Sequence, residues 1–135
     1  MTKIIIDTDI GDDVDDALAL AYLGNSPGIE ILGVTTVVGD TVKKAEIAGA
    51  LLNALDLSHV PVYAGIGNPD NDPPCQYDAI PDGFNNQPLT GAAETGAAEF
   101  LVEMAEKVDN LTILTIGPLT NIGAAIKLNP EEDVF

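Results

Sequence analysis

Short runs of β-branched and other apolar residues alternate along the chain with segments of helical character, and this alternation restricts the fold more than any other feature. The apolar runs cover residues 3–7, 29–38, 60–63 and 111–116. Such continuous runs are typical of strands that are buried on both faces of a sheet. The helical segments cover residues 15–23, 42–55, 92–108 and 118–129. This order predicts an α/β fold, a Rossmann-like parallel sheet with right-handed crossovers and helices on both faces.

The length of 135 residues suits one folding unit, so we expect a single α/β domain over residues 1–135. Residues 64–90 have no clear period and contain five prolines and three glycines, which predicts a long loop there. Loops of this length in compact domains are usually lids, binding loops or mobile segments, and we expect a lid-like loop. A doubly wound sheet usually has more than four strands, so we expect the N-terminal part of a larger domain.

Acidic residues dominate the composition, with 22 Asp and Glu against five Lys and no Arg, so the formal net charge is -17. So few basic side chains cannot neutralise the phosphates of a nucleic acid, and the same charge disfavours anionic membrane surfaces. The single cysteine, Cys75, excludes an internal disulfide and a thiolate zinc cluster. The first apolar run is too short for a signal peptide or a membrane span. We therefore expect a cytoplasmic protein that binds neither nucleic acid nor membranes.

The segment from Asp7 to Asp16 contains six Asp residues in ten positions, directly after the first predicted strand and before the first predicted helix. Two like charges about 4 Å apart cost roughly 4 kcal/mol at an effective dielectric constant of 20. No Lys or Arg lies nearby in the sequence to balance them. One or two of these residues could be ordinary helix caps, but six exceed what a helix N-terminus uses. At a strand end of an α/β sheet, they predict a site for calcium or magnesium.

Four stretches of this sequence resemble the inosine-uridine-preferring nucleoside hydrolases in order and spacing. They are residues 4–11 with 15–20 (IIIDTDIG and DDALAL), 33–40 (GVTTVVGD), 60–65 (VPVYAG) and 117–122 (GPLTNI). The resemblance covers essentially the whole chain, but only half or less of a family member. It implies hydrolysis of the N-glycosidic bond of a ribonucleoside to ribose and free base, with calcium as cofactor. It also implies a small-molecule nucleoside substrate and a homo-oligomer.

The resemblance also implies the roles of the catalytic residue and the metal ligands. Asp9 matches the family's Asp that binds calcium and acts as general base on the calcium-bound water. Asp16 matches a further calcium ligand. Ile116 occupies the position at which the family uses a backbone carbonyl as a ligand, so its side chain is no obstacle. Asp7 matches a supporting residue near the site.

Two substrate-binding residues follow from the same resemblance. Asp15 matches the Asp that holds a ribose hydroxyl. The family's shorter signature has one residue between the Gly and the Asp pair, whereas three intervene here, so Asp13 is an alternative to Asp15. Asp12 lies in this intervening segment, and we assign it no role. Asp40 stands where many members have an Asn near the site; we expect it to bind substrate, with an N-cap for the following helix as the alternative.

Two other functions stay open. A haloacid-dehalogenase-type phosphatase also begins with an apolar strand and Asp-x-Asp, and would use Asp7 as nucleophile with magnesium. Gly11 and the early Asp15-Asp16 pair count against it. A non-catalytic calcium-binding fragment is the second alternative, because the resemblance places the family's remaining calcium-binding Asp, its ribose-binding Asn and Glu residues and its leaving-group His after residue 135. We therefore expect these 135 residues to be inactive alone.

Overall fold

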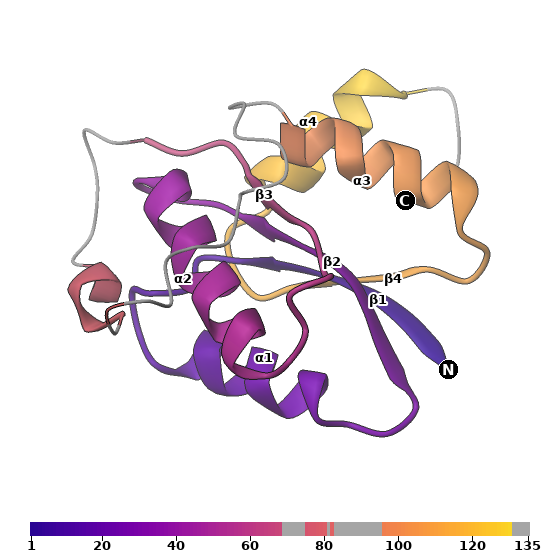
Figure 1. Cartoon of the computed structure of the whole chain (residues 1–135). Coiled ribbons are helices and arrows are strands. Elements are labelled where there is room, and N and C mark those ends of the chain that lie inside the picture. The colour runs from indigo at the N-terminus through magenta and orange to yellow at the C-terminus, as the bar shows by residue number, and fades with distance from the viewer. Residues whose placement is uncertain (69–74, 81, 83–95, 131–135) are drawn as a thin grey trace.

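A computed structural model of the protein describes residues 1–68, 75–80, 82 and 96–130. In this part of the chain, four parallel strands form one sheet between two layers of helices (Figure 1). The strands are β1 (Thr2–Thr8), β2 (Ile29–Thr36), β3 (Val62–Ala64) and β4 (Thr112–Thr115). The helices are α1 (Asp15–Gly24), α2 (Thr41–Ala54), α3 (Gly96–Lys107) and α4 (Thr120–Leu128), with a short 3-10 helix, η2 (Gln76–Ala79). The predicted α/β class is confirmed.

Much of the predicted lid-like loop over residues 64–90 falls outside the described residues, so its role stays a prediction. Within it, η2 is described and lies against the turn after β1, because the backbone N–H of Gln76 donates to the carbonyl oxygen of Gly11 at 2.7 Å. The helix predicted over residues 92–108 is described from Gly96 onward as α3.

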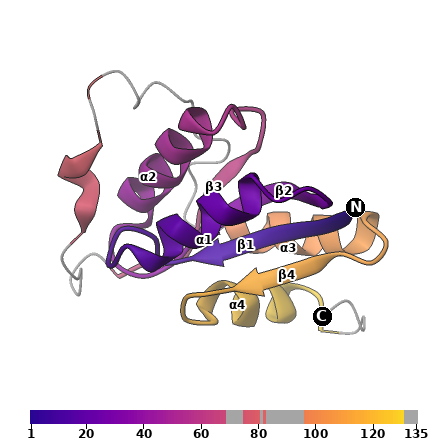
Figure 2. The ribbon, with the colours of Figure 1, turned by 90° about the horizontal axis from the view of Figure 1, so that it is seen from below.

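The sheet has the order β3-β2-β1-β4, and its two faces carry two separate apolar clusters. Ile4 and Ile6 of β1 pack with Leu20 of α1 and Leu52 of α2. Ile5, between them in sequence, packs in the opposite cluster with Phe100 of α3. Figure 1 shows the sheet between these two helical layers, and Figure 2, seen from below, shows α3 behind β1 and β4. Alternate side chains of one continuous apolar run therefore fill both halves of the core, each fully buried Ile contributing about 1.5–3 kcal/mol relative to exposure.

β2 is shorter than the sequence predicts. The apolar run extends to residue 38, but the strand ends at Thr36. Val38 has a φ of 72° and Gly39 a φ of 60°, which are left-handed conformations that a strand does not contain. These two residues turn the chain from the end of β2 into α2, so the predicted strand end was wrong by two residues.

The parallel strands bring three chain segments together at one edge of the sheet. Asp7 of β1 lies opposite Thr35 of β2 on one side and opposite Thr115 of β4 on the other. Because all strands run in the same direction, the residues that follow β1, β2 and β4 lie at the same edge. The six-Asp segment therefore shares this edge with the turn into α2 and the turn into α4.

The helices of the described residues are short, and α2 is the longest with 14 residues. Within the described ranges, no helix has both the length and the apolar character needed to cross a bilayer. Three helices of the described residues keep large apolar side chains at the surface, namely Leu18 and Tyr22 on α1, Val42 on α2, and Ile126 and Leu128 on α4.

Candidate metal and nucleoside site

The structure brings two of the predicted ligands, Asp9 and Asp16, together at the carboxyl end of β1. Asp9 follows the strand and is half-buried, and Asp16 is buried in the first turn of α1. Asp13 and Asp15 are both exposed, so the structure does not decide which of them holds a ribose hydroxyl. The acidic first turn of α1 interacts favourably with the helix dipole, which explains why a helix begins there despite the crowded charge.

The carboxylate of Asp16 sits in a polar but crowded position. The Thr8 hydroxyl donates to Asp16 Oδ2 at 2.5 Å and accepts a hydrogen bond from the backbone N–H of Ile10 at 3.0 Å. The pKa of Asp16 is raised to about 6, chiefly by burial and further by the neighbouring carboxylates of Asp9 and Asp15, while the Thr8 hydroxyl opposes the shift. Two carboxylates held this closely favour a cation between them.

Asp7 lies in β1, two residues before Asp9, and is fully buried. Its Oδ1 accepts hydrogen bonds from the Thr35 hydroxyl at 2.6 Å and from Asn121 Nδ2 at 2.7 Å. Its Oδ2 has no hydrogen-bond partner among the described residues. Burial raises the pKa of Asp7 above its ordinary value, and the two donors oppose that shift. A carboxylate without solvent access is a poor nucleophile for phosphate, which argues against the phosphatase alternative.

Asn121 connects four elements below the site, a role that the sequence analysis missed. Besides Asp7 on β1, its Nδ2 donates to the carbonyl oxygen of Thr36 on β2 at 2.9 Å. Its Oδ1 accepts the backbone N–H of Ile66, after β3, at 2.9 Å. Asn121 is itself fully buried at the start of α4. The signal was present, because Asn121 is part of the motif of residues 117–122 that carries the family resemblance.

The turn between β4 and α4 lies directly against Asp9. The backbone N–H of Ile116 donates to the carbonyl oxygen of Asp7 at 2.9 Å. A Cβ atom placed on Gly117 would lie 3.0 Å from the Asp9 nitrogen and 3.3 Å from Asp9 Oδ1. Only a residue without a side chain fits so close to Asp9, and its predecessor Ile116 belongs to the same turn. The three predicted ligands thus come from segments that meet at this point.

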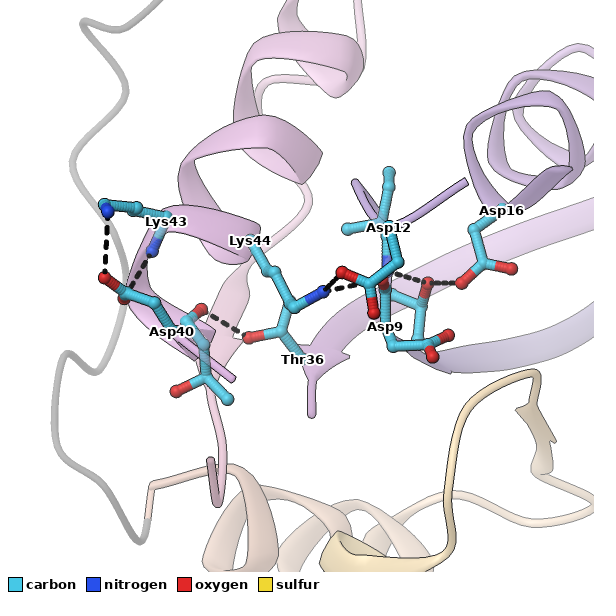
Figure 3. Close-up of polar contacts among 10 residues, drawn as sticks. Asp9, Asp12, Asp16, Thr36, Asp40, Lys43 and Lys44 are labelled. Carbon is cyan, nitrogen blue, oxygen red and sulfur yellow. Dashed lines mark hydrogen bonds and ion pairs between the residues drawn. The ribbon is translucent and has the colours of Figure 1, made fainter. Parts of the chain in front are cut away.

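A basic residue balances part of the acidic segment, which the sequence analysis did not foresee. Lys44 of α2 is fully buried, and its Nζ donates to the carbonyl oxygen of Asp9 at 2.9 Å and forms an ion pair with the carboxylate of Asp12 (Figure 3). Asp12, to which the sequence assigned no role, is therefore the partner of a buried charge. A buried lysine is costly unless it is paired, so this contact is part of the structure of the site.

Asp40 caps α2, which confirms the alternative that the sequence left open for it. Its Oδ1 accepts the backbone N–H of Lys43 at 3.1 Å, and its Oδ2 lies 3.6 Å from Lys43 Nζ. In Figure 3, Asp40 lies on the opposite side of Lys44 from Asp16. The role of Asp40 in substrate binding stays a prediction.

Loss of this cap has an expected cost. Asp40→Ala removes the acceptor of the Lys43 N–H and should lower the free energy of unfolding by about 1 kcal/mol in equilibrium urea denaturation. Asp40→Asn is the matched control, because Asn is an equally good N-cap, and it should retain most of the stability. The exposed ion pair with Lys43 contributes little, so equal losses in both variants would show that the charge and not the cap matters.

The oxygen atoms of the predicted ligands fit a hard cation, although they are few. Among the described residues, no group of three or more His, Cys, Asp or Glu side chains is arranged to hold a metal. The predicted set has two carboxylates and one backbone carbonyl, and calcium takes six to eight oxygen ligands. The close Asp9–Asp16 pair and the unpartnered Oδ2 of Asp7 both fit a nearby positive charge. Water or further groups would complete the coordination.

A cavity of about 710 Å³ lies beside the turn that follows β1, between α1, α2 and η2. Its lining is mostly apolar and includes Ile10, Ile47 and Leu51. Of the six-Asp segment, Asp12 and Asp13 reach this cavity, whereas Asp9 and Asp16 do not line it. The cavity and the carboxylate pair are therefore separate features.

Comparison with known proteins identifies the family. The family model described as inosine-uridine preferring nucleoside hydrolase matches residues 4–133. This chain belongs to that family. "Probable uridine nucleosidase 1" of Oryza sativa subsp. japonica is 36% identical over 138 residues, covering 95% of this chain and 42% of the relative. "Pyrimidine-specific ribonucleoside hydrolase RihB" of Escherichia coli O157:H7 (strain EC4115 / EHEC) is 36% identical over 140 residues, covering 95% of this chain and 43% of the relative.

Solved structures agree with this assignment. The plant nucleoside hydrolase PpNRh1 superposes with a TM-score of 0.69 at 26% identity, over 96% of this chain and 43% of that protein. A nucleoside hydrolase of Bacillus anthracis has a TM-score of 0.75 over 96% of this chain and 46% of its own, and at 24% identity it supports the fold alone. This chain thus spans about 43% of the length of the curated relatives it matches, as its resemblance to the family implied.

Proposed function

We propose that this chain supplies the calcium-binding and water-activating side of a nucleoside hydrolase site, which splits the N-glycosidic bond of a ribonucleoside into ribose and free base. The observation that carries the proposal is the convergence of Asp9 and Asp16 at the end of β1, against the turn that contains Ile116 and Gly117. The membership of the chain in the nucleoside hydrolase family supports the reaction class.

In this proposal, Asp9 and Asp16 would hold calcium through their carboxylate oxygens, and Ile116 would hold it through its backbone carbonyl. When bound, the ion supplies a hard Lewis acid that lowers the pKa of a water molecule. Asp9 accepts the proton of the attacking water, which is a general-base role. The fixed negative charge at this edge of the sheet stabilises the positive charge that develops on the ribose as the C–N bond breaks.

We assign the binding of the ribose to carboxylates at the same edge that keep access to solvent. Asp15, or Asp13 in its place, would accept a hydrogen bond from a ribose hydroxyl, and Asp40 at the start of α2 would face the substrate from the next strand end. The nucleobase is not specified by these contacts. The names of the relatives include uridine, pyrimidine and inosine-guanosine hydrolases, so we propose a ribonucleoside without assigning its base.

The chain alone offers too few ligands for calcium and too few groups to hold a nucleoside. Two carboxylates and one carbonyl are fewer than the six to eight oxygens of calcium, and reacting groups misplaced by about 1 Å can lower a rate a hundredfold. The relatives are more than twice as long as the part that this chain matches. We therefore propose that the 135 residues bind calcium weakly and do not turn over nucleosides on their own.

Ribose release from uridine and inosine tests this proposal. Three proteins are compared in the presence of calcium: this chain, E. coli RihB as positive control, and a fusion of residues 1–130 to the part of RihB that the chain does not match. We expect no turnover by the chain, and calcium-dependent turnover by the fusion that chelation abolishes. Turnover by the chain within tenfold of RihB would contradict the incomplete site. A cooperatively folded fusion that binds calcium without releasing ribose would favour the non-catalytic alternative.

A further inference from the structure

Lys44 is a buried cation that the proposed reaction does not use. Its side chain has no exposed surface, although it is the longest polar side chain in the buried core of the described residues. An ammonium group has three hydrogen-bond donors and no acceptor, so it must find oxygen atoms within the protein. Lys44 finds two of them in the segment after β1, namely the carbonyl oxygen of Asp9 and the carboxylate of Asp12.

These two contacts close a tight turn around the proposed base. The backbone N–H of Asp12 points to the carbonyl oxygen of Asp9 at 3.4 Å, the same oxygen that accepts from Lys44 at 2.9 Å. Gly11, the third residue of this turn, has a φ of 100°, which a side chain would disfavour. Lys44 therefore contacts the turn at both ends and joins it to α2 (Figure 3).

We propose that Lys44 is a positioning residue: it holds the turn of residues 9–12 so that the carboxylate of Asp9 faces Asp16. Lys44 contacts the main chain of Asp9 and not its carboxylate, so it leaves the carboxylate free to act. The anchor comes from a rigid helix, whose own start is fixed by the Asp40 cap. This inference rests on the proposed calcium site, because the quantity that Lys44 controls is the geometry of that site.

Electrostatics and positioning predict opposite effects of removing Lys44. A positive charge near a cation site repels the cation, so on charge alone Lys44→Met should strengthen calcium binding. If Lys44 positions Asp9, the same change should weaken binding, because groups that orient a metal ligand typically contribute about 10- to 100-fold in metal affinity. The sign of the change therefore distinguishes the two roles.

The experiment is a calorimetric titration of calcium into the chelator-treated chain and its variants. We expect Lys44→Met to weaken binding about 10- to 100-fold. Lys43→Met is the matched control: it removes the same charge from the adjacent, exposed residue of α2 and should leave the affinity within about threefold, since exposed charges are well screened. Lys44→Arg, which keeps the charge and the donors, should restore part of the affinity. Unchanged or tighter binding by folded Lys44→Met would overturn the proposal.

A second pair of variants decides the question if Lys44→Met does not fold. Asp12→Ala releases Lys44 from its partner, and Asp13→Ala removes the same negative charge from the adjacent exposed residue. Charge alone predicts a modest loss of calcium affinity in both variants, whereas positioning predicts that Asp12→Ala binds calcium about tenfold or more weakly than Asp13→Ala. Equal affinities would contradict the role of Lys44. Absence of calcium binding by the wild-type chain would instead contradict the proposed metal site.

Discussion

Asp9→Asn should weaken calcium binding by this chain by more than about 100-fold, because a direct ligand is expected to contribute more than the groups that orient it. The change keeps the size of the side chain but removes a charged ligand and the group that accepts the proton of the attacking water. In the fusion protein with RihB, ribose release should therefore fall by at least about 100-fold, the lower range for the loss of a general base. Calcium affinity is measured by calorimetry, and ribose release at saturating calcium.

The control for this variant is Asp56→Asn, the same change at an exposed position after the other end of α2. It removes one negative charge without touching the edge of the sheet that holds Asp9, so both quantities should stay near those of the wild type. If Asp9→Asn keeps near-normal turnover with calcium bound, another residue accepts the proton. If Asp56→Asn causes a similar loss, the overall charge of the protein and not Asp9 controls calcium binding.

Asn121→Ala should lower the free energy of unfolding by about 3 kcal/mol or more, because buried hydrogen bonds to charged groups contribute about 1.5–3 kcal/mol and unpaired buried groups cost about 1–3 kcal/mol each. The variant leaves the Asp7 carboxylate with one donor and the Thr36 carbonyl and the Ile66 N–H without this partner. A loss of this size is a large part of the stability of a domain, and it is measured by equilibrium denaturation in urea.

Asn129→Ala is the matched control for the Asn121 variant. Asn129 follows the same helix and its Nδ2 donates to Glu106 Oε1 at 2.9 Å, but this hydrogen bond is at the surface. Its loss should change stability by no more than about 0.5 kcal/mol. If Asn121→Ala loses less than about 1 kcal/mol, water replaces the amide below the site and Asn121 is not the structural link that its contacts indicate.

The sheet and its helices could be predicted because the information is local. The run of Ile4 to Ile6 has no polar residue on either face, which required a strand buried on both sides, and Asp40 precedes its helix at the N-cap position. The end of β2 could not be predicted, because Val38 is a good strand residue that the turn into α2 forces into a left-handed conformation. Tertiary context overrode local preference there.

The six Asp residues show where sequence reasoning stops. Without the family resemblance the sequence does not distinguish these acidic residues from one another, whereas the structure places them in different environments. Asp7 is held by Thr35 and Asn121, Asp12 by Lys44 and Asp16 by Thr8, while Asp13 and Asp15 face solvent. These partners lie up to 114 positions away in the chain, so no local pattern could assign them. What the sequence could indicate was the excess of carboxylates at a strand end.

The central claim is that Asp9 and Asp16 form a calcium site at the end of β1, and calorimetric titration of calcium into the chelator-treated chain tests it most directly. We expect one calcium ion to bind per chain, with the heat of binding lost in both Asp9→Asn and Asp16→Asn and retained in Asp56→Asn. An absence of binding heat up to about 1 mM calcium, the weak end of the range for protein calcium sites, would contradict the claim.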